Sequence, residues 1–242
     1  MRNENDGTTF KVQSLMIGRG VERVLGILMV IGLVIGLYAA LVYAPADAVQ
    51  GEVQRLMYLH VPLILVSYLA FFVVFVTSIL YLWRRQQQHD AIAHSSAEIG
   101  VLFTALAIAI GSIWGRPTWG AWWTWDARLT TTAILLLMFL GYLMLRTLVE
   151  DPSRGATFCA VLGIIGFLDI PIIHMSVVWW RTLHQPASML RPGPSTVAPD
   201  MQVALYANLA AFALLYGYLL VKRLRIEEAR QELFRLQMEL LG

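Results

Sequence analysis

Six apolar stretches constrain the fold of this sequence more than any other feature. Each is about as long as the roughly 20 residues that a helix needs to cross a bilayer. Because lipid cannot satisfy unpaired backbone amides, stretches that span a membrane must be helical. The sequence therefore predicts an all-α, polytopic membrane protein with six transmembrane helices. The predicted spans cover approximately Val21–Val42, Leu56–Trp83, Ala97–Ile113, Leu129–Leu148, Ala156–Val178 and Met201–Val221.

The composition fits a bilayer environment and leaves no room for a soluble domain. Of the 242 residues, 58% are hydrophobic and 14% are charged, whereas soluble domains carry about 25% charged residues. We expect a cytoplasmic tail over residues 1–20, a transmembrane domain over 21–221 and a cytoplasmic amphipathic helical tail over 222–242. Neither a Walker-type Gly-Lys-Ser/Thr motif nor a Rossmann-type glycine pattern occurs, so we expect no nucleotide hydrolysis. No nucleic-acid partner is expected either.

The distribution of positive charge predicts how the chain is oriented. Thirteen of the 18 lysines and arginines lie on one side of the predicted spans, and five lie on the other side. The positive-inside rule assigns the richer side to the cytoplasm. Both termini are then cytoplasmic, and three loops face outward, at about residues 43–55, 114–128 and 179–200.

Tryptophans gather in one of these outer loops. Residues 114–125 hold five of the chain's eight tryptophans. An aromatic belt is one interpretation, but a belt spreads its aromatic residues over helix ends on both sides of the membrane. If residues 118–126 are helical, spacings of three and four place four side chains on one face. They are Trp119, Trp122, Trp123 and Asp126.

Such a face of indole rings suits a large, flat and mostly apolar ligand, because stacking area supplies the affinity. Arg116 and Arg128 flank the loop, and arginine binds carboxylates in a bidentate manner. A planar macrocycle that carries propionate groups meets both requirements.

Two of the five histidines lie at the same predicted depth as the tryptophan-rich loop. His60 is within about two turns of the outer end of the second span, and His184 directly follows the fifth span. Each lies near an arginine, Arg55 or Arg181. Taken singly, each could be an interfacial histidine bonded to backbone or water. Together, on separate elements, they could bind one porphyrin iron from opposite faces.

The other three histidines receive different interpretations. His89 and His94 fall in a polar cytoplasmic loop, where we expect them to be solvated. His174 lies in the outer half of the fifth span, five residues after Asp169 and three after Pro171. Ionisable groups inside a span mark function by default. For this pair, however, we favour a local Asp–His hydrogen bond at a kink over a metal ligand.

Two segments carry a family resemblance, the tryptophan-rich run WGAWWTWDARLT and the run IPIIHMSVVWWRTLHQPAS. They resemble the heme-handling membrane proteins of c-type cytochrome maturation. The length and the six spans resemble the heme exporter protein C family over nearly the whole chain. The resemblance implies a bacterial inner-membrane protein that binds heme b at the periplasmic face and loads it onto a membrane-anchored periplasmic heme chaperone. It also implies an ATP-binding-cassette complex and a small single-span membrane subunit as partners within the lipid bilayer.

The resemblance also assigns roles to residues. It implies that the axial ligands of the heme iron are His60 and His184. We expect Arg128 and Arg55, and also Arg116 and Arg181, to neutralise the propionates. The implied tryptophan-rich signature comprises Trp114, Trp119, Trp122, Trp123, Trp125 and Asp126.

No nucleophile or acid–base pair is evident, so we interpret the chain as a platform that presents heme rather than as an enzyme. Three other functions stay open. A bis-histidine electron carrier would use the same ligands and retain its heme. A heme–protein ligase would act on apocytochrome itself, and a structural membrane subunit would bind no heme.

Overall fold

The structure is a computed structural model that describes residues 18–185 and 193–241, and its regular elements there are helices. Six helical segments are long and apolar enough to cross a membrane, which confirms the predicted all-α fold with six candidate spans. The elements are α1 (Arg19–Tyr38), the π-helix η1 (Ala39–Tyr43), the 3-10 helix η2 (Glu52–Leu56), α2 (Met57–Arg84), α3 (Gln87–Trp119), α4 (Ala127–Leu148), α5 (Pro152–Phe167), α6 (Asp169–Trp179) and α7 (Pro199–Leu241).

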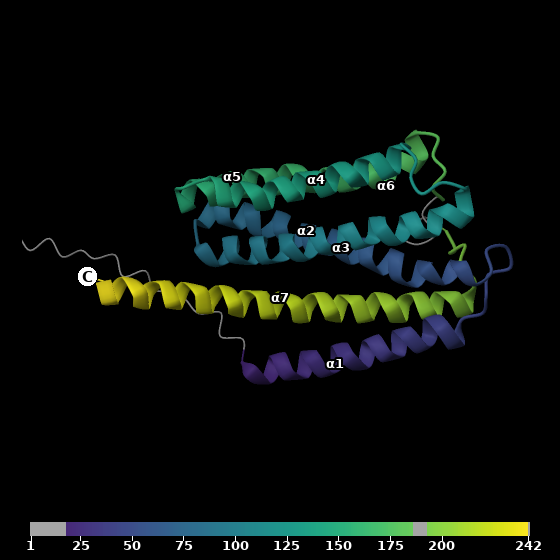
Figure 1. Ribbon diagram of the computed structural model, residues 1–242, viewed down its shortest axis with the longest axis horizontal. Coiled ribbons are helices and arrows are strands. Elements are labelled where there is room, and N and C mark those ends of the chain that lie inside the picture. Colours follow the sequence, from purple (N-terminus) through teal and green to yellow (C-terminus); the bar gives the residue numbers. More distant parts are fainter. Residues whose placement is uncertain (1–17, 186–192, 242) are drawn as a thin grey trace, which may run out of the picture.

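The helices pack side by side in a bundle whose centre is the antiparallel pair α2 and α3 (Figure 1). Helices α4, α5 and α6 lie on one side of this pair, and α7 lies on the other. Helix α1 packs against α7 at the edge of the bundle and exposes most of its large apolar side chains. A helix that is apolar nearly all round is suited to contact with lipid.

Aromatic side chains hold the centre of the bundle together. Phe71 of α2 stacks on Phe139 of α4 with ring centroids 3.8 Å apart. Both side chains are fully buried, and Leu135 and Tyr142 pack in the same cluster. In a membrane-spanning bundle, such residues stabilise the fold through close packing between helices.

Helix α3 begins ten residues before the span that the sequence predicts, so the interpretation of 84–96 as a polar loop is wrong. Several polar side chains of this region, such as Asp90 and Ser96, lie inside the bundle instead of in water. Asp90 forms a bidentate ion pair with Arg146 of α4. The hydroxyl of Ser96 donates to the carbonyl of Ala70 at 2.8 Å and bonds the Tyr216 hydroxyl at 2.7 Å.

The predicted fifth span consists of two helices, because the chain breaks at Leu168 between α5 and α6. Pro171 lies in the first turn of α6. It has no N–H to donate to the carbonyl four residues earlier, and its ring clashes with that carbonyl. A break at this point follows from that missing bond.

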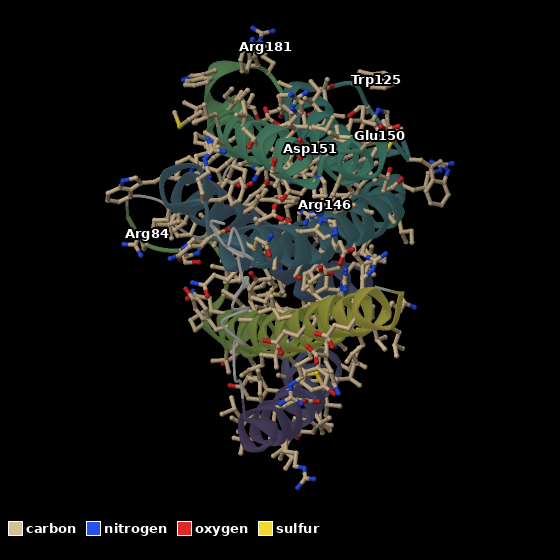
Figure 2. The ribbon with its side chains drawn as sticks, turned by 90° about the vertical axis from the view of Figure 1, so that its left-hand side faces the viewer. Arg84, Trp125, Arg146, Glu150, Asp151 and Arg181 are labelled. Carbon is tan, nitrogen blue, oxygen red and sulfur yellow. The ribbon has the colours of Figure 1, made fainter. Side chains whose placement is uncertain are left out.

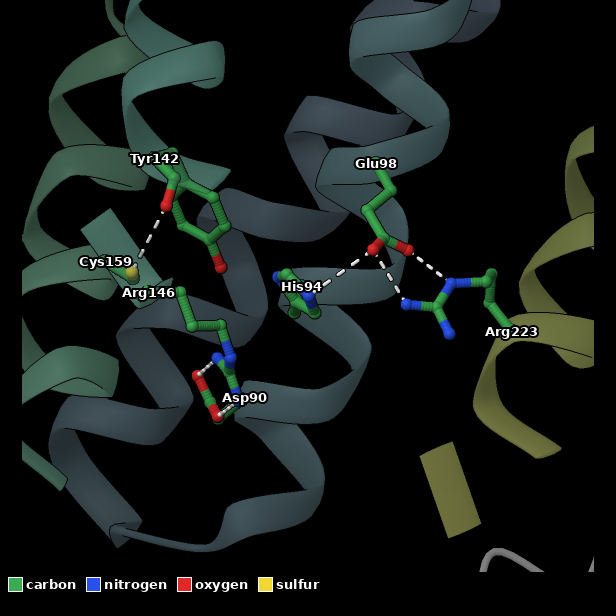
Figure 3. A network of polar contacts seen from close by, with 7 residues as sticks. All are labelled: Asp90, His94, Glu98, Tyr142, Arg146, Cys159 and Arg223. Carbon is green, nitrogen blue, oxygen red and sulfur yellow. Dashed lines mark hydrogen bonds and ion pairs between the residues drawn. The ribbon is translucent and has the colours of Figure 1, made fainter. Parts of the chain in front are cut away.

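Ion pairs tie several helices together at the end of the bundle away from the tryptophan-rich segment (Figure 3). Glu98 of α3 pairs with Arg223 of α7 and lies 3.4 Å from His94. Glu22 of α1 pairs with both Lys222 and Arg225 of α7. These ion pairs fix the positions of α1 and α3 along the axis of α7.

Candidate ligand-binding site

A cavity of about 590 Å³ lies at the end of the bundle where α3 ends and α4 begins. Helices α2, α3, α4 and α6 supply most of its walls, and Phe167 of α5 and residues 122–123 and 184–185 complete them. Its volume is in the range of about 300–1,000 Å³ that is typical of small-molecule sites. Eight residues singled out in the sequence line it: His60, Trp114, Trp119, Trp122, Trp123, Arg128, His174 and His184.

His60 and His184 face each other across this cavity. The ring centroids of His60 and His184 are 6.5 Å apart, and the ring planes are inclined at 35°. An imidazole nitrogen bonds a transition metal at about 2 Å, so two rings that hold one metal between them have centroids about 6 Å apart. The observed spacing fits a single metal ion bound by both rings.

Backbone carbonyls set the tautomer of both rings. His60 Nδ1 lies 2.9 Å from the carbonyl oxygen of Ala107, and His184 Nδ1 lies 3.0 Å from that of Gln185. A carbonyl can only accept, so each Nδ1 carries the proton. Nε2 then keeps its lone pair, which is the arrangement of a metal-binding histidine.

His184 lies beyond the end of α6, outside the candidate spans. Burial and, secondarily, the positive charge of Arg128 lower the pKa of His184 to about 4. The ring is therefore neutral at pH 7 and does not need to lose a proton before it binds a metal.

Each histidine has an indole of α3 beside it. The rings of Trp114 and His60 meet edge to face with centroids 5.9 Å apart, and those of Trp119 and His184 do so at 5.8 Å. The Trp114 indole N–H also donates to the side chain of Gln50 at 2.8 Å. Thus α3 holds both indoles, and the segment before η2 fixes one of them.

The rest of the tryptophan-rich segment is not helical, so the expected single helical face over 118–126 is wrong. Helix α3 ends at Trp119, where Gly120 adopts a left-handed conformation with φ of +79°. Asp126 then caps α4 by accepting from the backbone N–H groups of Arg128 and Leu129. Between Gly120 and Asp126 the chain is irregular, so its indoles do not lie along one helix face.

This irregular segment brings its indoles to different places. Trp122 and Trp123 line the cavity. Trp125 does not, and its side chain is 80% exposed and projects from the surface (Figure 2). Its ring contacts that of Trp123 edge to face at 5.5 Å.

Of the four arginines considered for carboxylate binding, Arg128 alone lines the described cavity. Arg55 instead donates to the carbonyls of Ala40 and Ala44 and pairs with Glu52. Arg116 donates to the carbonyl of Gly120 at 2.7 Å and so closes the last turn of α3. The fourth, Arg181, is exposed and projects away from the bundle (Figure 2).

Two buried donors of the cavity wall lack a partner among the described residues. They are Nη1 of Arg128 and Nε1 of Trp123. A buried donor without an acceptor costs about 1–3 kcal/mol, so both favour a ligand that brings oxygen acceptors. A pair of carboxylates meets this need.

The expected hydrogen bond between Asp169 and His174 is absent from the described structure. Oδ2 of Asp169 is buried without a partner, and His174 lines the cavity. Tyr68 and Thr132 line the cavity as well, and neither was among the predicted site residues. Helical spacing from predicted site residues could have identified both, since Tyr68 follows His60 by eight residues and Thr132 follows Arg128 by four.

Fold and site together define a polytopic helical membrane protein with an aromatic cavity that holds two facing histidines. The family model described as heme exporter protein C matches residues 10–239. The chain therefore belongs to the heme exporter protein C family.

Individual relatives support the same assignment. Heme exporter protein C of Bradyrhizobium diazoefficiens is 44% identical over 209 residues, which cover 86% of this chain and 79% of the relative. That of Haemophilus influenzae is 39% identical over 199 residues, or 82% of this chain and 80% of the relative. A mitochondrial protein of Marchantia polymorpha, named as ccmC-like and of cytochrome c biosynthesis, is 35% identical over 189 residues, or 78% and 80% of the two chains.

Proposed function

We propose that the protein binds heme b between His60 and His184 at the periplasmic face of the bacterial inner membrane and delivers it to a heme chaperone for c-type cytochrome maturation. The observation that carries this proposal is the pair of facing imidazoles, 6.5 Å apart, each with Nδ1 bonded to a backbone carbonyl. Both Nε2 atoms are then free to bind iron from opposite faces of a porphyrin.

The composition of the site favours a metal that arrives with ligands of its own. Among the described residues there is no group of three or more His, Cys, Asp or Glu side chains that could hold a metal ion. Two imidazoles alone leave an iron ion incompletely coordinated. In a porphyrin, four ring nitrogens fill the plane and leave two axial positions for histidines.

The unpaired donors of the wall support the same ligand. Arg128 and Trp123 offer buried N–H groups without protein acceptors among the described residues, and heme carries two propionates. The indoles of Trp114, Trp119, Trp122 and Trp123 supply apolar contact for the macrocycle. In this arrangement the side chains bind the heme, orient it and exclude water from its iron.

Exposed indoles at the rim favour delivery of the heme to a second protein. Trp122 and Trp125 are 58% and 80% exposed, and exposed tryptophans are enriched where proteins bind each other. We assign this rim to the membrane-anchored heme chaperone. Asp126, at the base of the same segment, positions Arg128 through its cap of α4. Arg55 acts on the site indirectly, by holding η1 against η2.

The remaining assignments follow from family membership and charge distribution. The ion-paired end of the bundle faces the cytoplasm, with tails over residues 1–20 and 222–242. An ATP-binding-cassette complex and a small single-span subunit are the membrane partners. The protein contributes proximity and orientation to heme delivery and no nucleotide hydrolysis of its own.

Transfer of heme to the chaperone tests this function. The protein is co-expressed with the heme chaperone, and covalently bound heme on the purified chaperone is measured. We expect the His60→Ala/His184→Ala protein to abolish loading, and His89→Ala, at the other end of α3, to leave it unchanged. Normal loading by the double variant would refute the proposal.

A bis-histidine electron carrier remains the second candidate, because the same ring pair would serve it. The two functions differ in what happens to bound heme. Heme that stays on the protein during incubation with excess apo-chaperone, while its iron cycles reversibly between redox states, would favour the carrier.

A further inference from the structure

We propose that Gly111 is a positioning residue for heme binding, because its missing side chain provides the space in which the His60 ring lies against α3. The inference rests on the proposed function, since it concerns how one of the two ligands is held. It adds a residue that has no side chain to bind a metal.

The close approach of the ring to α3 requires glycine at this position. A Cβ added at Gly111 would lie 2.8 Å from Cε1 of His60, 3.0 Å from Nδ1 and 3.7 Å from Nε2. Real Cβ atoms essentially never come within 3.0 Å of a neighbouring heavy atom. The edge formed by Nδ1 and Cε1 therefore rests on the α3 backbone, and any larger residue must displace the ring.

The same glycine leaves the carbonyl of Ala107 accessible to the His60 ring. Ala107 lies one turn before Gly111, and its carbonyl accepts the hydrogen bond from His60 Nδ1 at 2.9 Å. In an α-helix a side chain leans toward the N-terminus, over the preceding turn. A side chain at 111 would therefore cover the Ala107 carbonyl, and the bond that keeps Nε2 free for iron would be lost.

A third residue on the same face of α3 limits where the ring can go. Trp114 meets His60 edge to face at 5.9 Å with an interplanar angle of 70°. Ala107, Gly111 and Trp114 follow each other at intervals of four and three residues, so they share one helix face. A ring pushed off Gly111 cannot move into Trp114, so its displacement changes the 6.5 Å spacing of the pair.

Simple helix packing is the competing explanation, because small residues let transmembrane helices approach closely. Gly100, on the same helix, supplies a matched comparison. A Cβ there would lie 2.6 Å from the ring of Phe71 in the core, away from the cavity. Gly141 of α4 has no atom within 4 Å of an added Cβ and controls for the substitution itself.

The experiment compares purified Gly111→Ala, Gly100→Ala and Gly141→Ala with the wild type, by optical spectrum, heme affinity and melting temperature without heme. We expect Gly111→Ala to lose the low-spin spectrum of bis-histidine heme and to bind heme about 10- to 100-fold more weakly, as altered support of a metal ligand typically does. Added imidazole should restore the low-spin spectrum. Gly100→Ala should melt earlier with the spectrum unchanged, and Gly141→Ala should match the wild type.

A double-mutant cycle keeps the test valid if Gly111→Ala folds poorly. In the His60→Ala background the ring is gone, so Gly111→Ala should not lower the melting temperature of the heme-free protein any further. An equal loss in both backgrounds would overturn the inference. So would a wild-type spectrum and affinity for Gly111→Ala, or the same spectral change in Gly100→Ala. Wild-type protein that binds no heme at all would instead refute the proposed function.

Discussion

At the scale of single residues, the site depends on which polar atoms have partners within the protein and which do not. Arg55 and Arg128 illustrate the difference, because both are arginines at the end of the bundle that holds the cavity. The Arg55 guanidinium donates to two backbone carbonyls and pairs with Glu52. Arg128 Nη1 is buried and has no acceptor within the described residues. The sequence places both arginines near the loop but does not distinguish a structural from a binding role.

Arg128→Ala should weaken the binding of heme by about 10- to 100-fold, because a hydrogen bond to a charged group contributes about 1.5–3 kcal/mol. Titration of the heme-free protein with heme measures the change. Heme dimethyl ester is the control ligand, since its propionates are neutral and its affinity should be similar for wild type and variant. An equal loss for both ligands would show that Arg128 does not act on the carboxylates.

The low pKa of His184 predicts an unusual titration. The heme-free protein, labelled in its histidines, should show a His184 resonance that titrates near pH 4 instead of near 6.5. Between about pH 6.5 and 4 this histidine is protonated in the unfolded protein but still neutral in the folded protein. The free energy of unfolding is therefore highest above about pH 6.5 and decreases as the pH falls toward 4. Comparison with His184→Gln assigns the resonance. A midpoint near 6.5 would mean that the ring is solvated.

At the scale of elements, the connection between α3 and α4 decides which indoles reach the cavity. Gly120 ends one helix and Asp126 begins the next. Helical spacing predicts one face of indoles through this segment. That prediction is wrong, since a left-handed glycine and an N-cap both interrupt the helix. Trp119, Trp122 and Trp123 nevertheless line the cavity, because the segment as a whole lies over it.

Substitution of Asp126 separates its role in capping from a direct contact with ligand or partner. Asp126→Ala should destabilise the protein by about 1 kcal/mol, the typical cost of a lost N-cap, and should also weaken heme binding by releasing Arg128. Asp126→Asn should retain both properties, because asparagine caps a helix about as well as aspartate. Thermal unfolding and heme titration measure the two effects. Loss of heme binding in the asparagine variant, with stability unchanged, would indicate that the carboxylate charge is needed directly.

At the scale of the whole molecule, the bundle has two differently built ends. One end holds His60, His184 and the tryptophan-rich segment. The other holds ion pairs that join α1, α3, α4 and α7, of which Figure 3 shows those of α3 with α4 and α7. The six apolar stretches and the level of His60 and His184 were predictable, since span length and charge distribution are properties of the sequence. The helical start of α3, at Gln87, was not, because Asp90 and Glu98 pair with Arg146 of α4 and Arg223 of α7, which are distant in the chain.

Breaking one of these ion pairs should affect stability and leave the ligand site intact. Asp90→Asn leaves Arg146 without its partner in a mostly buried position, and such a loss costs about 3–5 kcal/mol when the pair is buried. In Asp90→Asn/Arg146→Met the unpaired charge is removed, so the loss should be smaller. Thermal unfolding measures both variants. Heme affinity should be unchanged in both, and a coupled loss of affinity would show that the two ends of the bundle do not act independently.

The most direct test of the account as a whole is the optical spectrum of the protein purified with heme, for wild type, His60→Ala, His184→Ala and the double variant. The account predicts a low-spin spectrum in the wild type, a changed spectrum in each single variant and no bound heme in the double variant. A wild-type protein without heme, or a double variant with the wild-type spectrum, would contradict it.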